Sequence, residues 1–434
     1  MQKLLLSILF FFVVELTYSS SKIITEDAFP SINYLNKVLV EVLVKDLFTP
    51  PAASRIHVYC NLAFYEVLTV NDASASFSSY LKGFPANSQI PQSKNTDQIL
   101  AASAAFIHIA RKLTFSFKEW DKATEQFARN SADSARFVTA STQHKEWLLK
   151  YIDWMNADGF AQRLAYKKYT VSDNPNAYQL TPPSYKSPIE PYWGTLRPFL
   201  IPSAETFGCS NILTFDTLNA STFYKINLEI YQKSMDFSQE QKDIALHWDC
   251  NPLQVESIGH AMLYSFRMTP GSHWVLIAAD ILEEQNIDIK KSAFIHTSLS
   301  LAMADAFITC WNDKYRFNTI RPVSFINSYI SDKWKPILQT PIFPEYPSGH
   351  SFVSATAAEV LTFLLGENFQ FTDKSQVSIG QNKKLYNSFH DAAEEAGISR
   401  YYGGIHYIEA IDIGFEAGKK IGKHVCQILQ KISQ

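Results

Sequence analysis

Hydrophobic positions recur at helical spacing over most of the chain. From about residue 31 to residue 154 apolar side chains repeat every three or four positions, as in the series Leu35, Val38, Leu39, Val42 and Leu43. The same period resumes near residue 221 and continues, with breaks at prolines, through segments 292–311, 352–365, 385–396 and 405–432. The pattern therefore predicts two groups of helices.

The stretch between these groups of helices is rich in proline and lacks the helical period. Proline would interrupt any helix there, and the prolines stand at Pro175, Pro182, Pro183, Pro188, Pro191, Pro198 and Pro202. We predict an all-α fold of two helical bundles, residues 22–156 and 220–434, joined by a long proline-rich connection, residues 157–219, that packs on them. The low glycine content, 15 residues in 434, also disfavours an all-β architecture.

The N-terminus has the pattern of a secretory signal. Lys3 precedes an apolar run at residues 4–14, and small residues follow at 19–21. An apolar run of that length is too short for a bilayer core, which needs about 20 helical residues. We therefore expect residues 1–21 to be a signal peptide and the protein to be secreted or periplasmic, with no membrane segment after cleavage.

Composition and charge narrow the classes further. The chain is 46% apolar and 19% charged, which is typical of a globular protein. Its net charge of −3 lacks the basic excess of a nucleic-acid-binding domain, so nucleic acid is not expected as a partner. The five cysteines are widely spaced and form no CxxC metal motif.

Candidate chemistry is concentrated in three short segments of the C-terminal third. In the first, Lys314 and Arg321 stand seven positions apart, directly before Pro322. On a helix, a separation of two turns would place both cations on one face, and Pro322 would mark the helix end. Alone, such a pair is usually an exposed helix face.

The second segment places Ser348, Gly349 and His350 at the start of a helix-like run. Free backbone N–H groups and a hydroxyl at a helix start can bind an anion, and His350 would then lie beside it. Taken alone, this segment fits an ordinary helix cap with an incidental histidine slightly better than a functional site.

The third segment has Arg400 and His406 on either side of two glycines. Arginine can bind two oxygens at once, and a histidine can ligate or attack the central atom of an oxyanion. Each segment alone suits a structural role, but all three in this order make coincidence improbable.

Together the segments resemble a family signature, Lys-x6-Arg-Pro, then Pro-Ser-Gly-His, then Ser-Arg-x5-His. It is the signature of the superfamily that joins vanadium-dependent haloperoxidases with type 2 phosphatidic acid phosphatases. The size of the chain, its predicted helices and its predicted export are similar to those of the bacterial haloperoxidase branch. The resemblance implies that Lys314, Arg321 and Arg400 neutralise the oxygens of vanadate or phosphate, that Ser348 and the Gly349 N–H donate hydrogen bonds to them, and that His350 is the acid–base group and His406 the axial metal ligand.

The resemblance leaves more than one activity open. As a peroxidase, the protein would use vanadate as cofactor to oxidise a halide with hydrogen peroxide to hypohalous acid, with Lys314 polarising the peroxide. As a secreted acid phosphatase, it would form a phosphohistidine at His406. A non-catalytic oxyanion-binding protein would have no use for two opposed histidines. Predicted export, chain length and Phe343 favour the peroxidase.

Phe343 bears on which halide is used. It stands seven residues before His350, where members of the peroxidase family vary between an aromatic residue and histidine. A phenyl ring offers neither charge nor a hydrogen bond to the peroxide, so iodide is the expected halide and bromide the next candidate. Plain core packing is an equally good reading of this residue.

One departure from the family leaves the partner of His406 open. Many phosphatase members have Asp four positions after the last histidine, where this chain has Ala410, with Asp412 two positions further on. A backbone carbonyl or another side chain would have to orient the ring instead. Further candidates for lining the pocket or for supporting hydrogen bonds are His273, Asp305 and Trp311.

Overall fold

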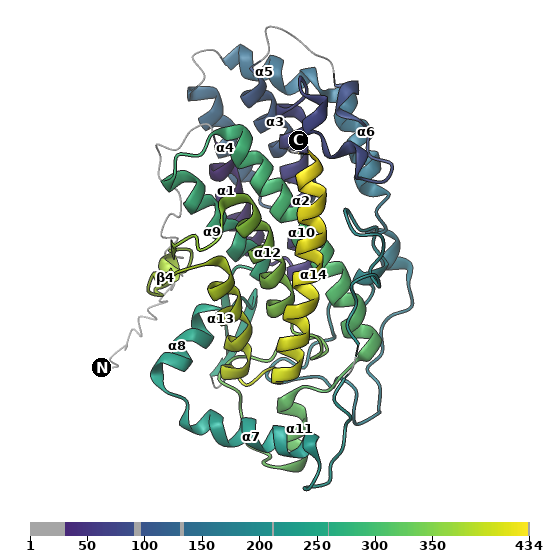
Figure 1. Cartoon of the computed structure of the whole chain (residues 1–434), viewed down its shortest axis with the longest axis vertical. Coiled ribbons are helices and arrows are strands. Elements are labelled where there is room, and N and C mark those ends of the chain that lie inside the picture. Colours follow the sequence, from purple (N-terminus) through teal and green to yellow (C-terminus); the bar gives the residue numbers. More distant parts are fainter. Residues whose placement is uncertain (1–30, 91–96, 131–133, 211, 259, 433–434) are drawn as a thin grey trace, which may run out of the picture.

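Helices make up nearly all of the regular structure in Figure 1, a computed structural model that describes residues 31–90, 97–130, 134–210, 212–258 and 260–432. The prediction of an all-α fold is confirmed. The predicted signal peptide, residues 1–21, lies outside the described residues.

The helices fall on either side of the connection. The N-terminal ones are α1 Ile32–Lys45, α2 Pro50–Leu68, α3 Gln98–Leu113, α4 Phe117–Asn130, α5 Ser134–Gln143 and α6 Lys145–Asn156. The C-terminal ones are α7 Thr222–Asp236, α8 Gln239–His247, α9 Pro270–Glu284, α10 Ile289–Phe317, α11 Pro322–Tyr329, α12 Gly349–Leu365, α13 Phe389–Tyr402 and α14 Ile408–Ile432. Two antiparallel pairs of short strands, which the hydrophobic pattern does not reveal, are β1 Leu253–Ile258 with β2 Ala261–Phe266 and β3 Phe371–Asp373 with β4 Lys384–Tyr386.

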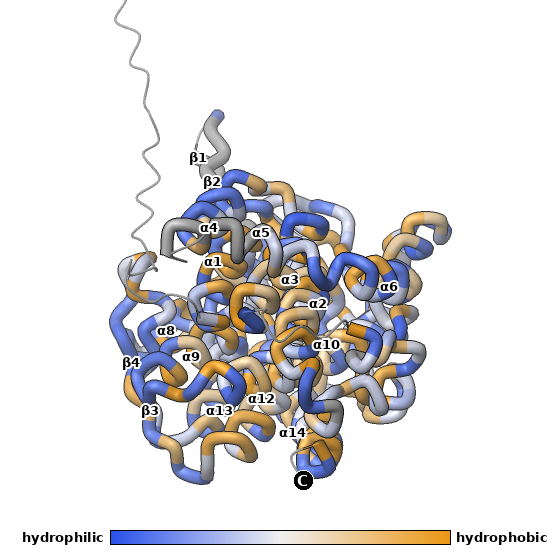
Figure 2. The backbone as a smooth tube through the Cα atoms, turned by 90° about the horizontal axis from the view of Figure 1, so that it is seen from above, coloured by the Kyte–Doolittle hydropathy of each residue, from blue (hydrophilic) through white to orange (hydrophobic). Residues whose placement is uncertain are grey.

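Two helices, α2 and α10, are buried along nearly their whole length. Pro50 and Pro51 begin α2, where the missing N–H groups cost no hydrogen bond, and Thr49 caps the helix. Nearly every side chain of α2 and of α10 beyond its first turn is buried. Apolar residues from Ile32 to Ile432 form one continuous cluster, and Figure 2 shows hydrophobic segments gathered around these helices. The apolar core therefore runs across the predicted boundary between the bundles.

Helix α14 packs closely on α12 because glycines face it. A side chain at Gly418 would place its Cβ 2.1 Å from the carbonyl oxygen of Phe352, and one at Gly414 would lie 2.9 Å from that of Ser348. Only glycine allows this approach of the two backbones. The contact fixes the start of α12, where the sequence predicts an anion site.

The proline-rich connection contains no α-helix within the described residues and is held by side chains of the core. Asp305, fully buried on α10, accepts hydrogen bonds from the backbone N–H groups of Phe199, Leu200 and Ile201 at 2.7, 2.7 and 3.0 Å. Asp305 thus supports the connection, and it does not line the cavity described below.

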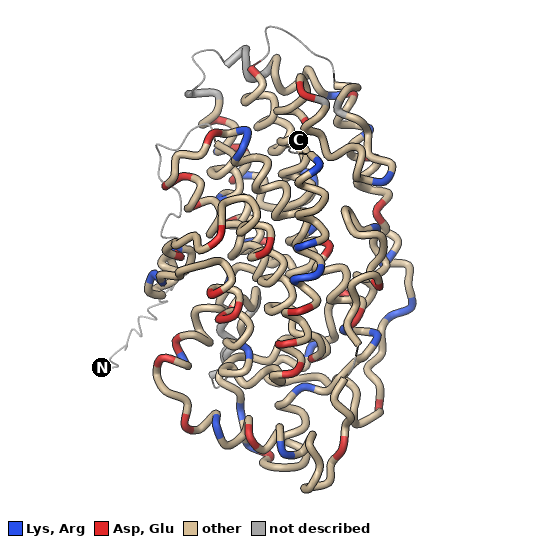
Figure 3. The backbone as a smooth tube through the Cα atoms, viewed as in Figure 1, with Lys and Arg blue, Asp and Glu red and all other residues tan. Residues whose placement is uncertain are grey.

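Helix α10 is the one helix among the described residues that is long and apolar enough, by length and composition, to cross a membrane. Of its most apolar window 94% is buried inside the protein, as in the core helix of a folded domain. Lysines and arginines are interspersed with acidic residues over the molecule in Figure 3, without a basic face in that view.

Candidate active site

Two of the predicted cations meet beneath one loop. Lys314 lies in the last turn of α10 and donates hydrogen bonds from Nζ to the carbonyl oxygens of Pro344, Glu345 and Pro347 at 2.9, 3.0 and 2.6 Å. Arg321 precedes α11 and donates from Nε to the carbonyl of Phe343 at 3.0 Å. Both side chains therefore hold the loop that leads into α12.

The geometry that brings these cations together differs from the predicted one. Helix α10 ends at Phe317, because Asn318 adopts the left-handed conformation with φ of 51°. Arg321 is consequently not on the same helix as Lys314. The two converge because the chain turns between them, and not because they share a helix face.

Arg321 also reaches the histidine of the third segment. Its Nη1 donates to the carbonyl of Ile405 at 2.8 Å and to Nε2 of His406 at 3.1 Å. Its Nη2 is buried and has no hydrogen-bond partner among the described residues. A buried guanidinium N–H without an acceptor lowers the stability of the folded protein, unless a ligand accepts a hydrogen bond from it.

The start of α12 offers further donors. The N–H of Ser351 donates to Oγ of Ser348 at 3.4 Å, and the hydroxyl of Ser351 donates to the same oxygen at 2.9 Å. Ser348 Oγ is thus an acceptor twice, so its own proton is available to a ligand. Gly349 is the first residue of the helix, and amides of a first turn have no partner within the helix.

The carboxylate of Glu345 orients the imidazole of His406. Its Oε1 lies 2.7 Å from Nδ1 of His406 and accepts the N–H of Tyr407 at 3.2 Å. Two donors on one carboxylate oxygen place the imidazole proton on Nδ1, so Nε2 carries the lone pair, which here accepts from Arg321 and is the one that a metal would use. The carbonyl of Ala410 accepts the N–H of Ser348 at 3.0 Å, and Asp412 is exposed.

One backbone carbonyl holds the remaining pair of predicted residues. The oxygen of Trp248 accepts a hydrogen bond from Nε2 of His350 at 3.0 Å and another from Nη2 of Arg400 at 2.6 Å. Since Nε2 of His350 is the donor, its Nδ1 carries the lone pair of the neutral ring. Nδ1 is therefore the nitrogen of His350 that can accept a proton.

These residues surround a cavity of about 170 Å³. All three parts of the chain contribute to its wall, which includes Phe48, Ile189, Phe343, His350, Arg400 and His406. Lys314, Arg321 and Ser348 are fully buried and are not among the residues that line this cavity, although each neighbours a lining residue through Phe343, His406 or Gly349.

Phe343 faces the cavity and covers the two cations. Its ring centroid lies 5.0 Å from Nζ of Lys314 and 5.1 Å from Cζ of Arg321. The ring packs on Trp311 at a centroid distance of 5.0 Å, and the buried indole N–H of Trp311 has no partner among the described residues. Phe343 therefore combines packing with a direct influence on the site.

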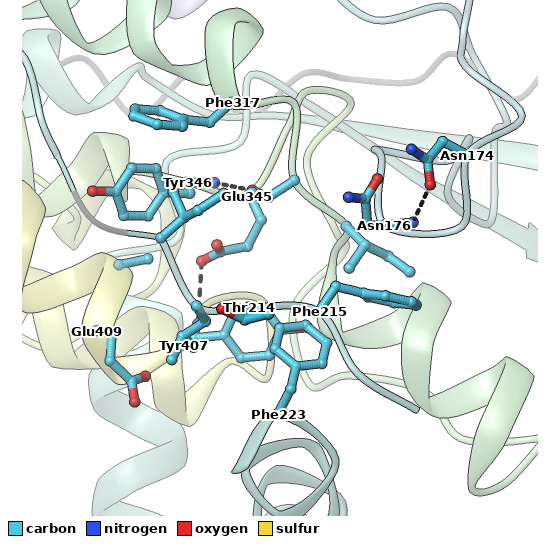
Figure 4. Close-up of a pocket in the computed structure, with 15 residues that line it drawn as sticks. Asn174, Asn176, Thr214, Phe215, Phe223, Phe317, Glu345, Tyr346, Tyr407 and Glu409 are labelled. Atoms are coloured by element: carbon cyan, nitrogen blue, oxygen red, sulfur yellow. Dashed lines mark hydrogen bonds between the residues drawn. The ribbon is translucent and has the colours of Figure 1, made fainter. Parts of the chain in front are cut away.

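A second cavity, of about 320 Å³, lies on the other side of Glu345. Figure 4 shows Glu345 at its wall with Tyr407, Phe223 and Glu409, and the dashed line between the Glu345 carboxylate and Tyr407 marks its bond to the backbone N–H of Tyr407. Glu345 lines this second cavity and binds His406, which lines the first, so the hydrogen bond between the two side chains connects the walls of the two cavities.

Burial dominates the electrostatics of the site. It lowers the pKa of Lys314 to about 7 and that of Arg321 to about 10, and it raises the pKa of Glu345 to about 7 against the charges of the two cations. Burial, and next the charges of neighbouring arginines, hold the pKa of His350 and His406 well below the usual range. A bound anion would relieve the repulsion among the cations, so the arrangement suits an oxyanion.

Sequence reasoning finds the cations, Ser348, Gly349 and both histidines, which the fold brings together. It misses Glu345 and the carbonyl of Trp248. The signal for Glu345 is a charged residue inside an otherwise uncharged loop, Phe-Pro-Glu-Tyr-Pro. Every residue has a backbone carbonyl, so the amino-acid sequence does not reveal which carbonyl acts as an acceptor in the site. Of the other candidates, Trp311 lines the cavity, whereas His273 lies behind Trp248 and does not.

The chain is similar to known proteins in sequence and in structure. A family model described as the VCPO second helical-bundle domain matches residues 294–434. A crystal structure described as the first bacterial vanadium-dependent iodoperoxidase is 38% identical, with a TM-score of 0.84, over 91% of this chain and 94% of that one. No curated protein matches the sequence.

Two other solved structures have the same fold. They are the holo and apo forms of a bacterial vanadium-dependent chloroperoxidase, 15% and 13% identical, with TM-scores of 0.69 and 0.66. They match 90% and 89% of this chain and 95% of each of theirs. Because the 38% identity extends over nearly the whole of both chains, we conclude that this protein belongs to the vanadium-dependent haloperoxidases.

Proposed function

We propose that this haloperoxidase binds vanadate at the start of α12 and uses hydrogen peroxide to oxidise iodide, with bromide as the next candidate, to hypohalous acid. The observation that carries the proposal is the state of His406. Its Nδ1 is bound to Glu345, so its Nε2 is presented as a ligand beside the unpartnered Nη2 of Arg321.

The residues present fit vanadate on chemical grounds. Arg321 Nη2, the hydroxyl of Ser348 and the N–H of Gly349 are donors for its oxygens, and His406 Nε2 is a nitrogen ligand for the metal. When bound, vanadate supplies a Lewis acid that activates hydrogen peroxide towards a halide. Lys314 gives three hydrogen bonds to backbone carbonyls, so in this geometry it acts on the anion through its charge.

The proton chemistry is assigned to His350. Its Nε2–H is engaged by the carbonyl of Trp248, so Nδ1 takes a proton from hydrogen peroxide and gives it up later in the cycle. Burial lowers the pKa of His350 and so keeps the ring neutral before the reaction, with Nδ1 unprotonated. Arg400, which shares the same carbonyl, adds positive charge at the cavity wall.

The test compares two activities in one preparation. Protein freed of anions is loaded with orthovanadate, and triiodide formation from iodide and peroxide is measured beside hydrolysis of an aryl phosphate without vanadate. We expect vanadate-dependent iodide oxidation. Phosphate hydrolysis without iodide oxidation would instead assign the phosphohistidine chemistry to His406.

The choice of halide is tested at Phe343. Chloride is harder to oxidise than iodide and needs a more strongly activated peroxide, which a phenyl ring over Lys314 and Arg321 does not provide. We expect the wild type to use iodide, and Phe343→His to shift kcat/KM towards bromide by about tenfold, which corresponds to about 1.4 kcal/mol. Steady-state kinetics with three halides at fixed vanadate give the answer.

The matched control is Phe48→His, the same exchange at another residue of the cavity wall, on the N-terminal side. Efficient chloride oxidation by the wild type would refute the argument. Equal halide ratios in the wild type and Phe343→His would leave Phe343 with a packing role alone.

The role of Glu345 gives a separate prediction. In Glu345→Gln the amide can still accept from Nδ1 of His406, but the negative charge that makes the ring a better ligand is lost. We expect vanadate affinity or turnover to fall about 10-fold to 100-fold. Glu409→Gln, at the wall of the second cavity but without a contact to His406, is the control. Unchanged affinity and turnover in Glu345→Gln would show that the imidazole is oriented without the carboxylate.

A further inference from the structure

A buried hydrogen-bond network lies behind the wall of the active site. His247, the last residue of α8, and His273, in the first turn of α9, place Nε2 at 2.9 and 2.7 Å from the same oxygen, Oδ2 of Asp373. The other oxygen of Asp373 accepts the N–H and the hydroxyl of Ser375 at 2.9 and 2.6 Å. All four side chains are buried.

The protons of this network can be placed. Burial alone would raise the pKa of Asp373, but the contacts with His273 and His247 lower it, so the carboxylate is ionised. An ionised carboxylate only accepts hydrogen bonds, so both histidines carry a proton on Nε2. Nδ1 of His273 can then accept from Sγ of Cys250, which lies 3.5 Å away.

Trp248 connects the network to the active site. Its indole packs on the ring of His273 with centroids 4.5 Å apart, and its N–H donates to Glu395 at 3.1 Å. Its carbonyl is the acceptor for both His350 and Arg400. The N–H of Cys250 donates to the same oxygen at 2.9 Å, so three donors converge on this one carbonyl.

We propose that Asp373 is a positioning residue, which acts through His247 and His273 to hold the carbonyl of Trp248 where it sets the tautomer of His350 and the orientation of Arg400. The proposal rests on the proposed function for the roles of those two residues. A displacement of Trp248 by about 1 Å would stretch both bonds beyond hydrogen-bond range. Nδ1 and Nε2 of His350 would then compete for the proton.

The same three side chains also form a set that could hold a metal ion, with their ligand atoms within 4.8 Å of one another. Hydrogen bonding accounts better for the geometry. Each imidazole lies at hydrogen-bond distance from one shared oxygen, and Ser375 and Cys250 are placed to complete the network.

The experiment uses two variants of the full chain. Asp373→Asn keeps the shape and removes the charge, and His273→Phe keeps an aromatic face beneath Trp248 but removes the bond to Asp373. The tautomer of His350 is read by long-range proton–nitrogen NMR on anion-free protein with ¹⁵N-labelled histidine, and His350→Gln assigns its signals. Vanadate affinity is measured by titration.

We expect a pure Nε2–H tautomer of His350 in the wild type and a mixture in both variants, with vanadate affinity lowered about tenfold. Asp305→Asn is the control, since it makes the same exchange at a buried carboxylate that binds backbone amides away from the cavity. It should lose thermal stability and keep both the tautomer and the affinity.

Two results would overturn the proposal. One is a lower melting temperature in Asp373→Asn and His273→Phe with the tautomer and affinity of the wild type, which would leave the network a packing role. The other is one equivalent of bound divalent metal in the wild type that Asp373→Asn loses. If His350→Ala keeps full turnover while the tautomer shift is seen, the positioning link is supported and the acid–base role of His350 fails.

Discussion

His406→Ala is expected to lose vanadate and peroxidase activity together, with affinity reduced by at least about a hundredfold, or about 2.7 kcal/mol. The substitution removes the nitrogen that would bind the metal. It also leaves the carboxylate of Glu345 without the Nδ1–H that it binds at 2.7 Å. That carboxylate would then repel the anion while the cations remain.

The measurement is vanadium content after dialysis, beside the rate of triiodide formation. His424→Ala is the matched control, because it removes an imidazole from α14 that contacts the carbonyl of Leu200 and not the cavity. Vanadium retained in His406→Ala at the level of the wild type would contradict the assignment of this residue as the ligand.

Arg321→Ala should weaken vanadate binding by about tenfold to a hundredfold. The guanidinium is fully buried and offers an unpartnered Nη2, and a charge-assisted hydrogen bond in such a place is worth about 1.5–3 kcal/mol. Its loss also frees Nε2 of His406 and the carbonyls of Phe343 and Ile405 from their donors. Loosening of the loop should add to the effect.

Isothermal titration with orthovanadate measures this change. Arg321→Lys keeps a charge but not the planar fork of donors, so its affinity should be intermediate. Arg316→Ala removes a cation five positions earlier that pairs with Asp313 and is half exposed, and it should bind as the wild type does. Equal affinity in Arg321→Ala would place the anion elsewhere.

Local pattern predicts the helices well, because their buried faces follow the helical period over many turns. The residues at which the helices end are less predictable. Lys314 and Arg321 were expected on a common helix face, yet a left-handed Asn318 ends α10 before Arg321 is reached. Side-chain chemistry identified the pair correctly, while the backbone route between them depends on one residue with an unusual φ.

Contacts between distant segments account for what the sequence does not reveal. Glu345 binds a histidine 61 positions away, and Asp305 binds backbone amides more than 100 positions away. Neither separation follows a helical or strand period, so spacing contains no information about it. The family pattern directs attention to position 410, where this chain has alanine, whereas the carboxylate comes from a different loop.

The burial of Lys314, Arg321 and Arg400 has a consequence for the stability of the whole fold. An anion that binds only the native state stabilises it by mass action, by about 2.7 kcal/mol at a concentration one hundred times its Kd. Phosphate has the charge and shape of vanadate, so it can occupy the same place in cells or buffers where vanadate is scarce. The vanadium content of a purified sample would then report a competition between the two anions, and phosphate in the buffer would protect the empty enzyme from heat while delaying its activation.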